Sequence, residues 1–411
     1  MKNVLFITES YSVAPSPNGA CVKNIVDEMI REGFNVSVLT LKNQYAKESF
    51  SNIDGVKVYR VKTYPEYNIY YSKTPKLLKS IFIRLLKALK IILIPFHPIT
   101  SPATLKRLYK KGKEVVIKDS IDTIVSVYRD AETAIAGVKL KRKFKDKKLV
   151  VYTLDAVSGG VCSNKLVPMK KHVKKCRKLE EKFIKECDVY VPMQSHIGVY
   201  ENRFSNYEGK IKYHDIPNLI FDGVDYAKES DVSLNFTFTG MMSETNADCS
   251  FFLKVFKEIL KVKDATFNVY GGITESLLGE IKKTGLFDKN VFYHGRVDKN
   301  ELISVRKNAD VLLTFGNNHP CGIPCKIFEY ISALKPILAF YKIDDDAGKA
   351  YLEKYQKAIV LKENDAMVEE YAGKIIEKLS DFSKISIDRD LVKETFYENT
   401  PRQFIETLKS I

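Results

Sequence analysis

The sequence contains no tryptophan and no CxxC pair, and its first strand–loop–helix unit carries no GxGxxG fingerprint. Its seven cysteines are scattered and odd in number, which argues against a regular disulfide framework. The N-terminal residues show no signal-peptide pattern, so we expect free thiols in a reducing cytoplasm. The missing GxGxxG disfavours a dinucleotide site in the N-terminal part of the chain.

The sequence also lacks a comfortable membrane span in the apolar run at residues 75–94, because five cations interrupt it. On a helical wheel the cations fall on one side and the aliphatic residues largely on the other. The cations are Lys76, Lys79, Arg84, Lys87 and Lys90. This pattern is typical of a basic amphipathic helix that lies in an anionic membrane interface. A helix packed on its own sheet with a solvated lysine face fits the pattern equally.

The chain is 411 residues long, which is long for one domain, so we expect two domains with separate cores. The formal net charge of +15 indicates an acidic partner or surface. Nucleic acid, anionic lipid headgroups and phosphorylated substrates all meet that requirement. A lysine-rich composition without tryptophan is also typical of an AT-rich genome, and the charge would then have no functional meaning.

Both halves of the sequence show alternating apolar strands and amphipathic helices. The first half opens with a strand at residues 3–7, a Pro/Ser/Gly loop, a helix ended by Gly33 and a strand at residues 35–40. The pattern restarts after residue 218, with a strand at residues 234–239 and further strands beyond it. We therefore predict an α/β protein with two doubly wound parallel sheets.

The stretch from residue 310 to residue 340 has the clearest functional pattern. A buried strand is followed by a loop containing Gly322, a helix over residues 325–334 and a second strand. The start of a helix attracts anions such as a diphosphate, and Lys326 places a cation there where the helix itself disfavours one. Glu329 follows one turn later and can accept hydrogen bonds from sugar hydroxyls. An ordinary crossover with a solvated lysine is the alternative.

This stretch resembles the donor-site helix of GT-B glycosyltransferases, especially the GT4-like enzymes of bacterial surface-polysaccharide and capsule assembly. The resemblance rests on Pro324-x-Lys326-x-x-Glu329-Tyr330, followed by Lys335-Pro336. It implies two Rossmann-like domains that face each other across a cleft. Residues 1–217 would be the acceptor domain, residues 218–393 the nucleotide-sugar donor domain, and residues 394–411 a helix that crosses back. Residues 211–218 resemble the hinge strand of the family.

The resemblance also assigns the donor site. Glu329 would hold the ribose, and Gly240 and Gly295 would bring backbone close to the diphosphate. Arg296 and Lys326 would stabilise its charge. The remaining donor-binding residues lie in the loop and the helix start: Gly322, Ile323, Pro324 and Cys325. Two features depart from the family. Cys321 replaces the first glutamate of Glu-x7-Glu, and residues 241–246 lack the usual Arg/Lys pair.

The acceptor side is predicted at the carboxyl ends of the N-terminal strands, where open α/β sheets bind ligands. The strand at residues 121–127 ends at Tyr128 and Arg129, and the strand at residues 149–153 ends before Asp155. Asn18 and Gly19 belong to the loop that faces the acceptor in the family. Asp155 is the candidate catalytic residue, although it could equally cap a helix. The family often has His-Asp at this point, and here the residue before Asp155 is leucine.

These observations predict transfer of a sugar from a nucleotide-diphosphate sugar to a glycan or a polyprenyl-diphosphate-linked acceptor. The resemblance implies a retaining, hexosyltransferase-type reaction without metal or other cofactor. His319, Cys321 and Cys325 lack a fourth ligand nearby, and we predict no metal there. We expect a cytoplasmic protein, with possible peripheral binding at the inner face of the plasma membrane.

Three alternatives remain open. The first is a non-catalytic GT-B protein that binds a sugar or an anionic polymer. The second is a GT-B sugar-nucleotide epimerase, which needs no acceptor. The third is a nucleic-acid binder that uses the basic helices, although the sequence contains no recognisable recognition module. We predict no specific nucleic-acid binding.

Overall fold

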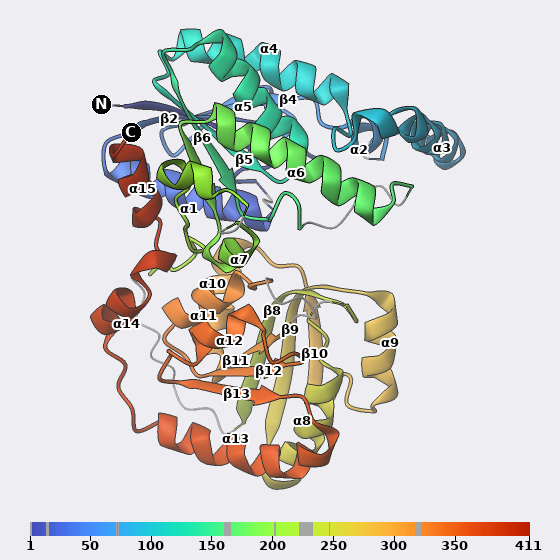
Figure 1. Ribbon diagram of the computed structural model, residues 1–411. Helices are drawn as coiled ribbons and strands as arrows, with labels where there is room; N and C mark the ends of the chain where they lie inside the picture. The colour runs from blue at the N-terminus through green and yellow to red at the C-terminus, as the bar shows by residue number, and fades with distance from the viewer. Residues whose placement is uncertain are drawn as a thin grey trace. The chain divides into compact units, whose positions relative to one another are not determined.

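The computed structural model divides the chain into two compact units. The first comprises Met1–Pro217 together with Pro401–Ile411, and the second comprises Asn218–Thr400. The residues that the structure describes are 2–13, 16–70, 72, 74–159, 166–200, 203–221, 233–245, 247–316 and 322–411. Each unit contains a mainly parallel sheet with helices on it (Figure 1). The prediction of two doubly wound α/β domains is confirmed.

The first unit is built on a seven-stranded sheet in which every pairing is parallel except that of β3 with β4. The four apolar residues of β1 from Val4 to Ile7 are fully buried, because helices cover both sides of this central strand. In sheet order the strands are β3 (Phe50–Ile53), β4 (Val56–Val61), β2 (Asn35–Leu41), β1 (Asn3–Ile7), β5 (Thr123–Tyr128), β6 (Lys148–Thr153) and β7 (Val189–Pro192).

Helices lie on both faces of this sheet. Figure 1 shows α4 (Pro102–Lys118), α5 (Ala131–Lys143) and α6 (Met169–Glu186) on one face, and α1 (Pro17–Arg31) packed with α15 (Arg402–Lys409) on the other. Ser16 caps α1 by accepting a hydrogen bond from the Gly19 N–H. The helix therefore begins at Pro17, and Asn18 and Gly19 lie in its first turn and not in the predicted loop.

The apolar run at residues 75–94 forms α3 (Lys76–Ile92), between α2 (Pro65–Tyr70) and the short helix η1 (Ile94–Phe96). None of its described side chains is buried. Leu77, Ile81 and Leu85 are 76%, 46% and 56% exposed. A helix packed against its own sheet would bury these residues, so that alternative is wrong. No helix that the structure describes is both long and apolar enough to span a bilayer.

The second unit has a six-stranded parallel sheet whose core is rich in phenylalanine. Its strands, in sheet order, are β10 (Val291–Gly295), β9 (Ala265–Ile273), β8 (Leu234–Met242), β11 (Val311–Phe315), β12 (Ile337–Tyr341) and β13 (Ala358–Lys362). Its helices are α8 (Ser250–Val262), α9 (Glu275–Lys283), α10 (Lys299–Asn308), α11 (Lys326–Ser332), α12 (Ala347–Leu352), α13 (Val368–Phe382) and α14 (Arg389–Thr395). α8 packs against α13, and phenylalanines of α8 cover β8 and β9.

Short helical segments complete the two units. They are η2 (Gln194–His196), α7 (Ile197–Tyr200) and η3 (Ser205–Lys210) in the first unit, and η4 (Asp365–Met367) and η5 (Tyr397–Asn399) in the second.

The C-terminal helix α15 belongs to the first unit. The ring of Phe404 lies 4.8 Å from that of Tyr152 and 6.2 Å from that of Phe6, measured between centroids. This apolar contact fixes the end of the chain to the sheet. The returning segment starts at Pro401, whereas the sequence placed its start at residue 394.

The strand predicted for residues 211–218 is not present. Only two isolated bridges occur there, from Ile211 to Tyr190 and from His214 to Met193. The backbone N–H groups of Lys212 and His214 donate to carbonyls of β7, so the segment follows the edge of the sheet. β7 ends at Pro192, and the last bridge of the segment is at His214, so the ladder does not continue to residue 218.

The carboxyl ends of β8 and β9 come unusually close together. Gly240 and Gly271 have φ angles of 131° and 130°, which side chains disfavour. A Cβ atom added to Gly271 would lie 1.9 Å from the carbonyl oxygen of Gly240. Only glycine therefore fits at position 271.

We expect Gly271→Ala to lower the free energy of unfolding by about 3 kcal/mol or more, since it adds both backbone strain and a steric overlap. Gly279→Ala is the matched control. Gly279 lies in α9 with open space around it, so alanine there should raise stability by up to about 1 kcal/mol. Urea unfolding of both variants tests this, and equal stabilities would contradict the close approach.

Candidate functional site

The start of α11 is fixed to β8 by a buried tyrosine. The backbone N–H of Thr239 donates a 2.9 Å hydrogen bond to the hydroxyl oxygen of Tyr330, which is fully buried. Burial raises the pKa of Tyr330 to about 12, so its hydroxyl stays neutral. Tyr330 follows the first turn of α11, so this contact holds the start of the helix near the carboxyl end of β8.

Lys326 projects from that first turn into a confined space. Its Nζ atom lies 3.6 Å from the centroid of the Phe238 ring. A Cβ atom at Gly240 would be 3.0 Å from the same Nζ, so any side chain there would press on the ammonium group. Burial lowers the pKa of Lys326 to about 7, against the opposing influence of Glu329 and Cys325. Near pH 7 the charged and neutral forms of the lysine are therefore both populated.

Glu329 lies one turn further along α11 and is held by two donors. Asn218 Nδ2 donates to its Oε1 at 3.0 Å, and Arg306 donates to its Oε2 at 2.7 Å. Asn218 also donates to the Cys325 carbonyl oxygen at 2.9 Å. The carboxylate keeps 37% of its side-chain exposure, so it is oriented by protein groups and still accessible to a ligand.

The other predicted donor residues lie near this point or at the edge of the sheet. Gly322, Ile323 and Pro324 are partly buried and lead directly into α11. The preceding part of the loop, including His319 and Cys321, lies outside the described residues. Gly295 ends β10 with a φ of 72°, and Arg296 follows it as an exposed residue. β9 separates β10 from β8, so Arg296 belongs to a more distant part of the same sheet edge.

The predicted acceptor residues of the first unit gather at the carboxyl ends of β1, β5 and β6. Asn18 Nδ2 donates to Asp155 Oδ2 at 3.1 Å. Arg129 pairs with Glu9 at 3.4 Å, and Ser16 also donates to Glu9. Asp155 does not cap a described helix; it is exposed just after β6. The arrangement provides carboxylates and amides at one sheet edge, which suits sugar hydroxyls.

Tyr128 does not join this group of polar side chains. It is 9% exposed and packs in the core, with its ring centroid 6.3 Å from that of Phe183. Burial raises the pKa of its hydroxyl, with Cys176 as the next contribution. Tyr128 is the last residue of β5, and its side chain points toward α6, while that of its neighbour Arg129 is exposed.

Several contacts of these sites were not predicted from the sequence. Arg306 lies in the last turn of α10, where cations are common, and nothing in the local pattern distinguishes it from a solvated one. Asn218 ends the segment that resembles the hinge strand, and its hydrogen bonds to α11 depend on the fold. Glu9 lies two residues after the end of β1, and the rule that ligands meet the carboxyl ends of strands would have indicated it.

A family model and solved structures give an independent comparison. Residues 233–381 match the family described as glycosyl transferases group 1. None of the curated proteins is a significant match to the sequence.

Solved structures match almost the whole chain at low identity. Sucrose-phosphate synthase from Thermosynechococcus elongatus has a TM-score of 0.64 at 12% identity, over 100% of this chain and 99% of that one. A trehalose-6-phosphate protein of E. coli, bound with UDP-2-fluoro glucose, has a TM-score of 0.63 at 10% identity, over 100% and 99%. HepE of Anabaena, in complex with UDP and glucose, has a TM-score of 0.59 at 13% identity, over all of both chains.

The structural matches are with GT-B proteins, and at these identities they establish the fold alone. The sequence match lies in the second unit, on the residues that form β8 to α13 and contain Lys326 and Glu329. The chain therefore has the GT-B fold, and residues 233–381 of its second unit are similar to the glycosyl transferases group 1 family.

Proposed function

We propose that the protein transfers a sugar from a nucleotide-diphosphate sugar, bound by the second unit, to an acceptor bound by the first. The observation that supports this most directly is the position of Lys326. Its ammonium is confined by Phe238 and Gly240, and its pKa of about 7 shows that the folded protein alone does not fully stabilise the charge. A diphosphate would supply the missing negative charge.

The proposed mechanism follows from where charge develops. Cleavage of the bond between the sugar and the diphosphate leaves negative charge on the departing phosphate. Lys326 and Arg296 would stabilise that charge, so the proposal requires no metal or other cofactor at the donor site. Glu329, oriented by Asn218 and Arg306, would accept hydrogen bonds from the ribose hydroxyls. Retention of anomeric configuration is carried over from the family resemblance.

Uridine diphosphate sugars are the first donors to test, because two structures of similar fold contain UDP or a UDP-sugar analogue. On the first unit, Asp155 and Asn18 would position the acceptor, with Asp155 as the candidate catalytic carboxylate. The acceptor we propose is a glycan or a polyprenyl-diphosphate-linked sugar of bacterial surface-polysaccharide synthesis.

A lipid-linked acceptor requires contact with a membrane, and α3 has the surface for it. Its aliphatic side chains are exposed, and lysines and Arg84 lie among them. The neighbouring helix α6 adds a strip of exposed cations, and Lys175 ties it to η1 through the carbonyl oxygens of Ile94 and Pro95. Exposed apolar and basic groups together are typical of peripheral binding to anionic lipid.

The test of the function is a panel of UDP-sugars incubated with and without glycan and polyprenyl-linked acceptors. Release of UDP that depends on an acceptor would support glycosyl transfer. Conversion of the sugar nucleotide into another sugar nucleotide without an acceptor would indicate an epimerase. Epimerases share this fold: UDP-GlcNAc 2-epimerase of Methanocaldococcus jannaschii matches at a TM-score of 0.56 and 12% identity, over all of both chains. Binding without turnover would indicate the non-catalytic alternative.

Glu329→Gln should weaken binding of the UDP-sugar by about 10- to 100-fold, since a charged acceptor of hydrogen bonds contributes about 1.5–3 kcal/mol. Glutamine keeps one acceptor oxygen for Asn218 or Arg306 but loses the charge that pairs with Arg306. Some loss of stability is therefore expected, and the thermal midpoint without ligand measures it separately from the affinity. Glu258→Gln, which removes a carboxylate paired with Lys261 on α8, is the control. Equal affinities of the two variants would contradict the ribose contact.

The affinity for a UDP-sugar should depend on pH through Lys326. The diphosphate binds the charged lysine, so affinity should be constant below pH 7 and fall by up to tenfold per unit above it, until the raised pKa of the complex is reached. Calorimetric titrations between about pH 6 and about pH 8.5 measure this. Lys326→Arg keeps the charge and should remove the dependence. An equal decline of affinity with rising pH in the unchanged protein and in Lys326→Arg would exclude Lys326 as the cause.

Neutralising Lys76, Lys79, Arg84 and Lys87 to glutamine should reduce binding to vesicles of anionic lipid by at least about tenfold, because each cation near the surface contributes about 1 kcal/mol. The matched control carries the same charge change on exposed lysines elsewhere in the first unit: Lys106, Lys110, Lys143 and Lys145. Co-sedimentation compares them. An equal loss in both variants would mean that net charge, and not α3, attracts the vesicles.

A further inference from the structure

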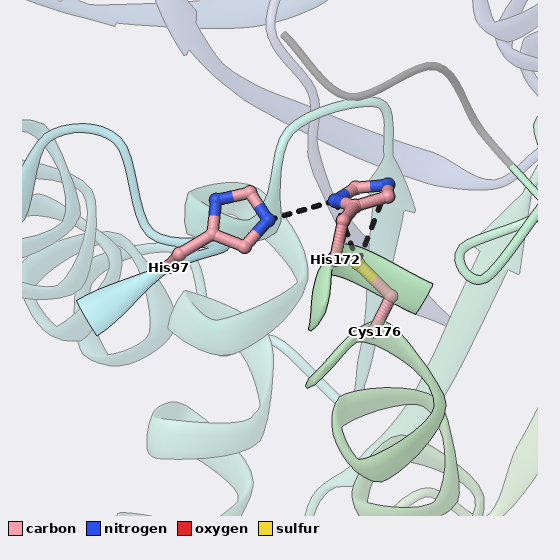
Figure 2. Close-up of side chains that lie close together, drawn as sticks. All are labelled: His97, His172 and Cys176. Carbon is pink, nitrogen blue, oxygen red and sulfur yellow. Dashed lines mark hydrogen bonds between the residues drawn. The ribbon is translucent and has the colours of Figure 1, made fainter. Parts of the chain in front are cut away.

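Three potential metal ligands meet inside the first unit, apart from the predicted donor and acceptor residues. They are His97, His172 and Cys176, which are 8%, 6% and 0% exposed. One ligand atom from each lies within 4.8 Å of the others. Figure 2 shows the two imidazole rings side by side with the Cys176 sulfur next to His172.

The protein holds these three residues in place from two sides. His172 and Cys176 are four residues apart on α6, so they share one face of the helix. His97 lies in the loop after η1. Lys175 donates to the carbonyl oxygens of Ile94 and Pro95 just before His97.

The other side of the loop is held by a buried carboxylate. Glu132 Oε1, on the fully buried first turn of α5, accepts hydrogen bonds from the N–H and hydroxyl of Thr100 and from the N–H of Ser101. The chain is therefore held both before and after His97 in the absence of a ligand. Binding of an ion would then cost less conformational entropy.

The distances between the ligand atoms approach those of a tetrahedral zinc site. Bonds of about 2.3 Å to sulfur and about 2.05 Å to nitrogen place a sulfur and a nitrogen about 3.6 Å apart, and two nitrogens about 3.3 Å apart. Cys176 Sγ lies 3.6 Å from His172 Nδ1. His97 Nε2 lies 2.7 Å from His172 Nδ1, because the two rings share a hydrogen bond. An ion between them would need the rings to separate by about 0.6 Å.

The chemical types of the three ligands also suit a metal ion. The imidazole of histidine is the commonest metal ligand in proteins. Two nitrogens and one thiolate form a donor set that zinc-class ions prefer over magnesium or calcium.

We propose that His97, His172 and Cys176 bind one zinc-class divalent ion, which fastens the loop after α3 to α6. A water molecule would complete four-coordination. Binding breaks the hydrogen bond between the imidazoles, and its proton moves to the other nitrogen of the same ring, so both rings stay neutral. The thiol releases one proton to solvent and binds as thiolate. The role is structural and separate from the donor chemistry of the second unit.

The test uses Co2+ as a spectroscopic probe on the full chain, kept reduced and freed of metal with a chelator. We expect one Co2+ per chain, a charge-transfer band of a cobalt–thiolate bond, and displacement of the ion by Zn2+. Cys176→Ala should remove the band, and His97→Gln should weaken binding by at least about 10- to 100-fold. His97→Gln changes a loop residue, so it keeps the test valid if Cys176→Ala does not fold.

Cys187→Ala is the matched control, because Cys187 is another buried thiol at the end of the same helix. Its band and affinity should equal those of the unchanged protein. Failure to bind Co2+ or Zn2+ at one ion per chain would overturn the proposal. A band that persists in Cys176→Ala, or one that disappears in Cys187→Ala, would overturn it as well.

Discussion

The position of the Lys326 ammonium is the constraint on which the candidate donor site depends. The ammonium faces an aromatic ring, and Gly240 leaves it room because it carries no side chain. The close approach of Gly240 and Gly271 fixes the backbone at that point. Folding thus places a cation where it loses part of its hydration, which lowers its pKa. A bound anion would reverse that loss, so the energetic cost in the free protein becomes affinity for a diphosphate.

The fold was predictable because its signals are local. Apolar strands alternate with amphipathic helices in both halves, and each strand needs only its own residues to be recognised. The placement of Lys326 and Glu329 one turn apart on one helix was predictable for a similar reason, since that spacing is local. Its partners Asn218 and Arg306 come from other parts of the chain, and no local pattern carries that information. Tyr128 shows the opposite case. The end of its strand was predicted, but its side chain packs in the core and does not join the predicted acceptor residues.

Only the structure shows where part of the high positive charge of the chain lies. The sequence left open whether the cations of residues 75–94 cover a packed helix or a free one. In the structure α3 leaves Leu77, Ile81 and Leu85 exposed, so the helix does not stabilise the sheet by burial. Exposed aliphatic groups are costly in water unless another surface covers them. The basic groups around them favour a negatively charged surface, which a lipid-linked acceptor would provide.

The cluster of His97, His172 and Cys176 connects this surface to the body of the first unit. The loop with His97 follows α3 and η1 directly, and α6 supplies the other two residues. An ion bound there would restrain the orientation of α3 through residues of the first unit alone. The candidate donor site, the exposed face of α3 and the proposed ion site rest on separate residues, so a change in one can be measured against the others left intact. A loss of vesicle binding on metal removal, with nucleotide affinity unchanged, would reveal that the ion acts through α3.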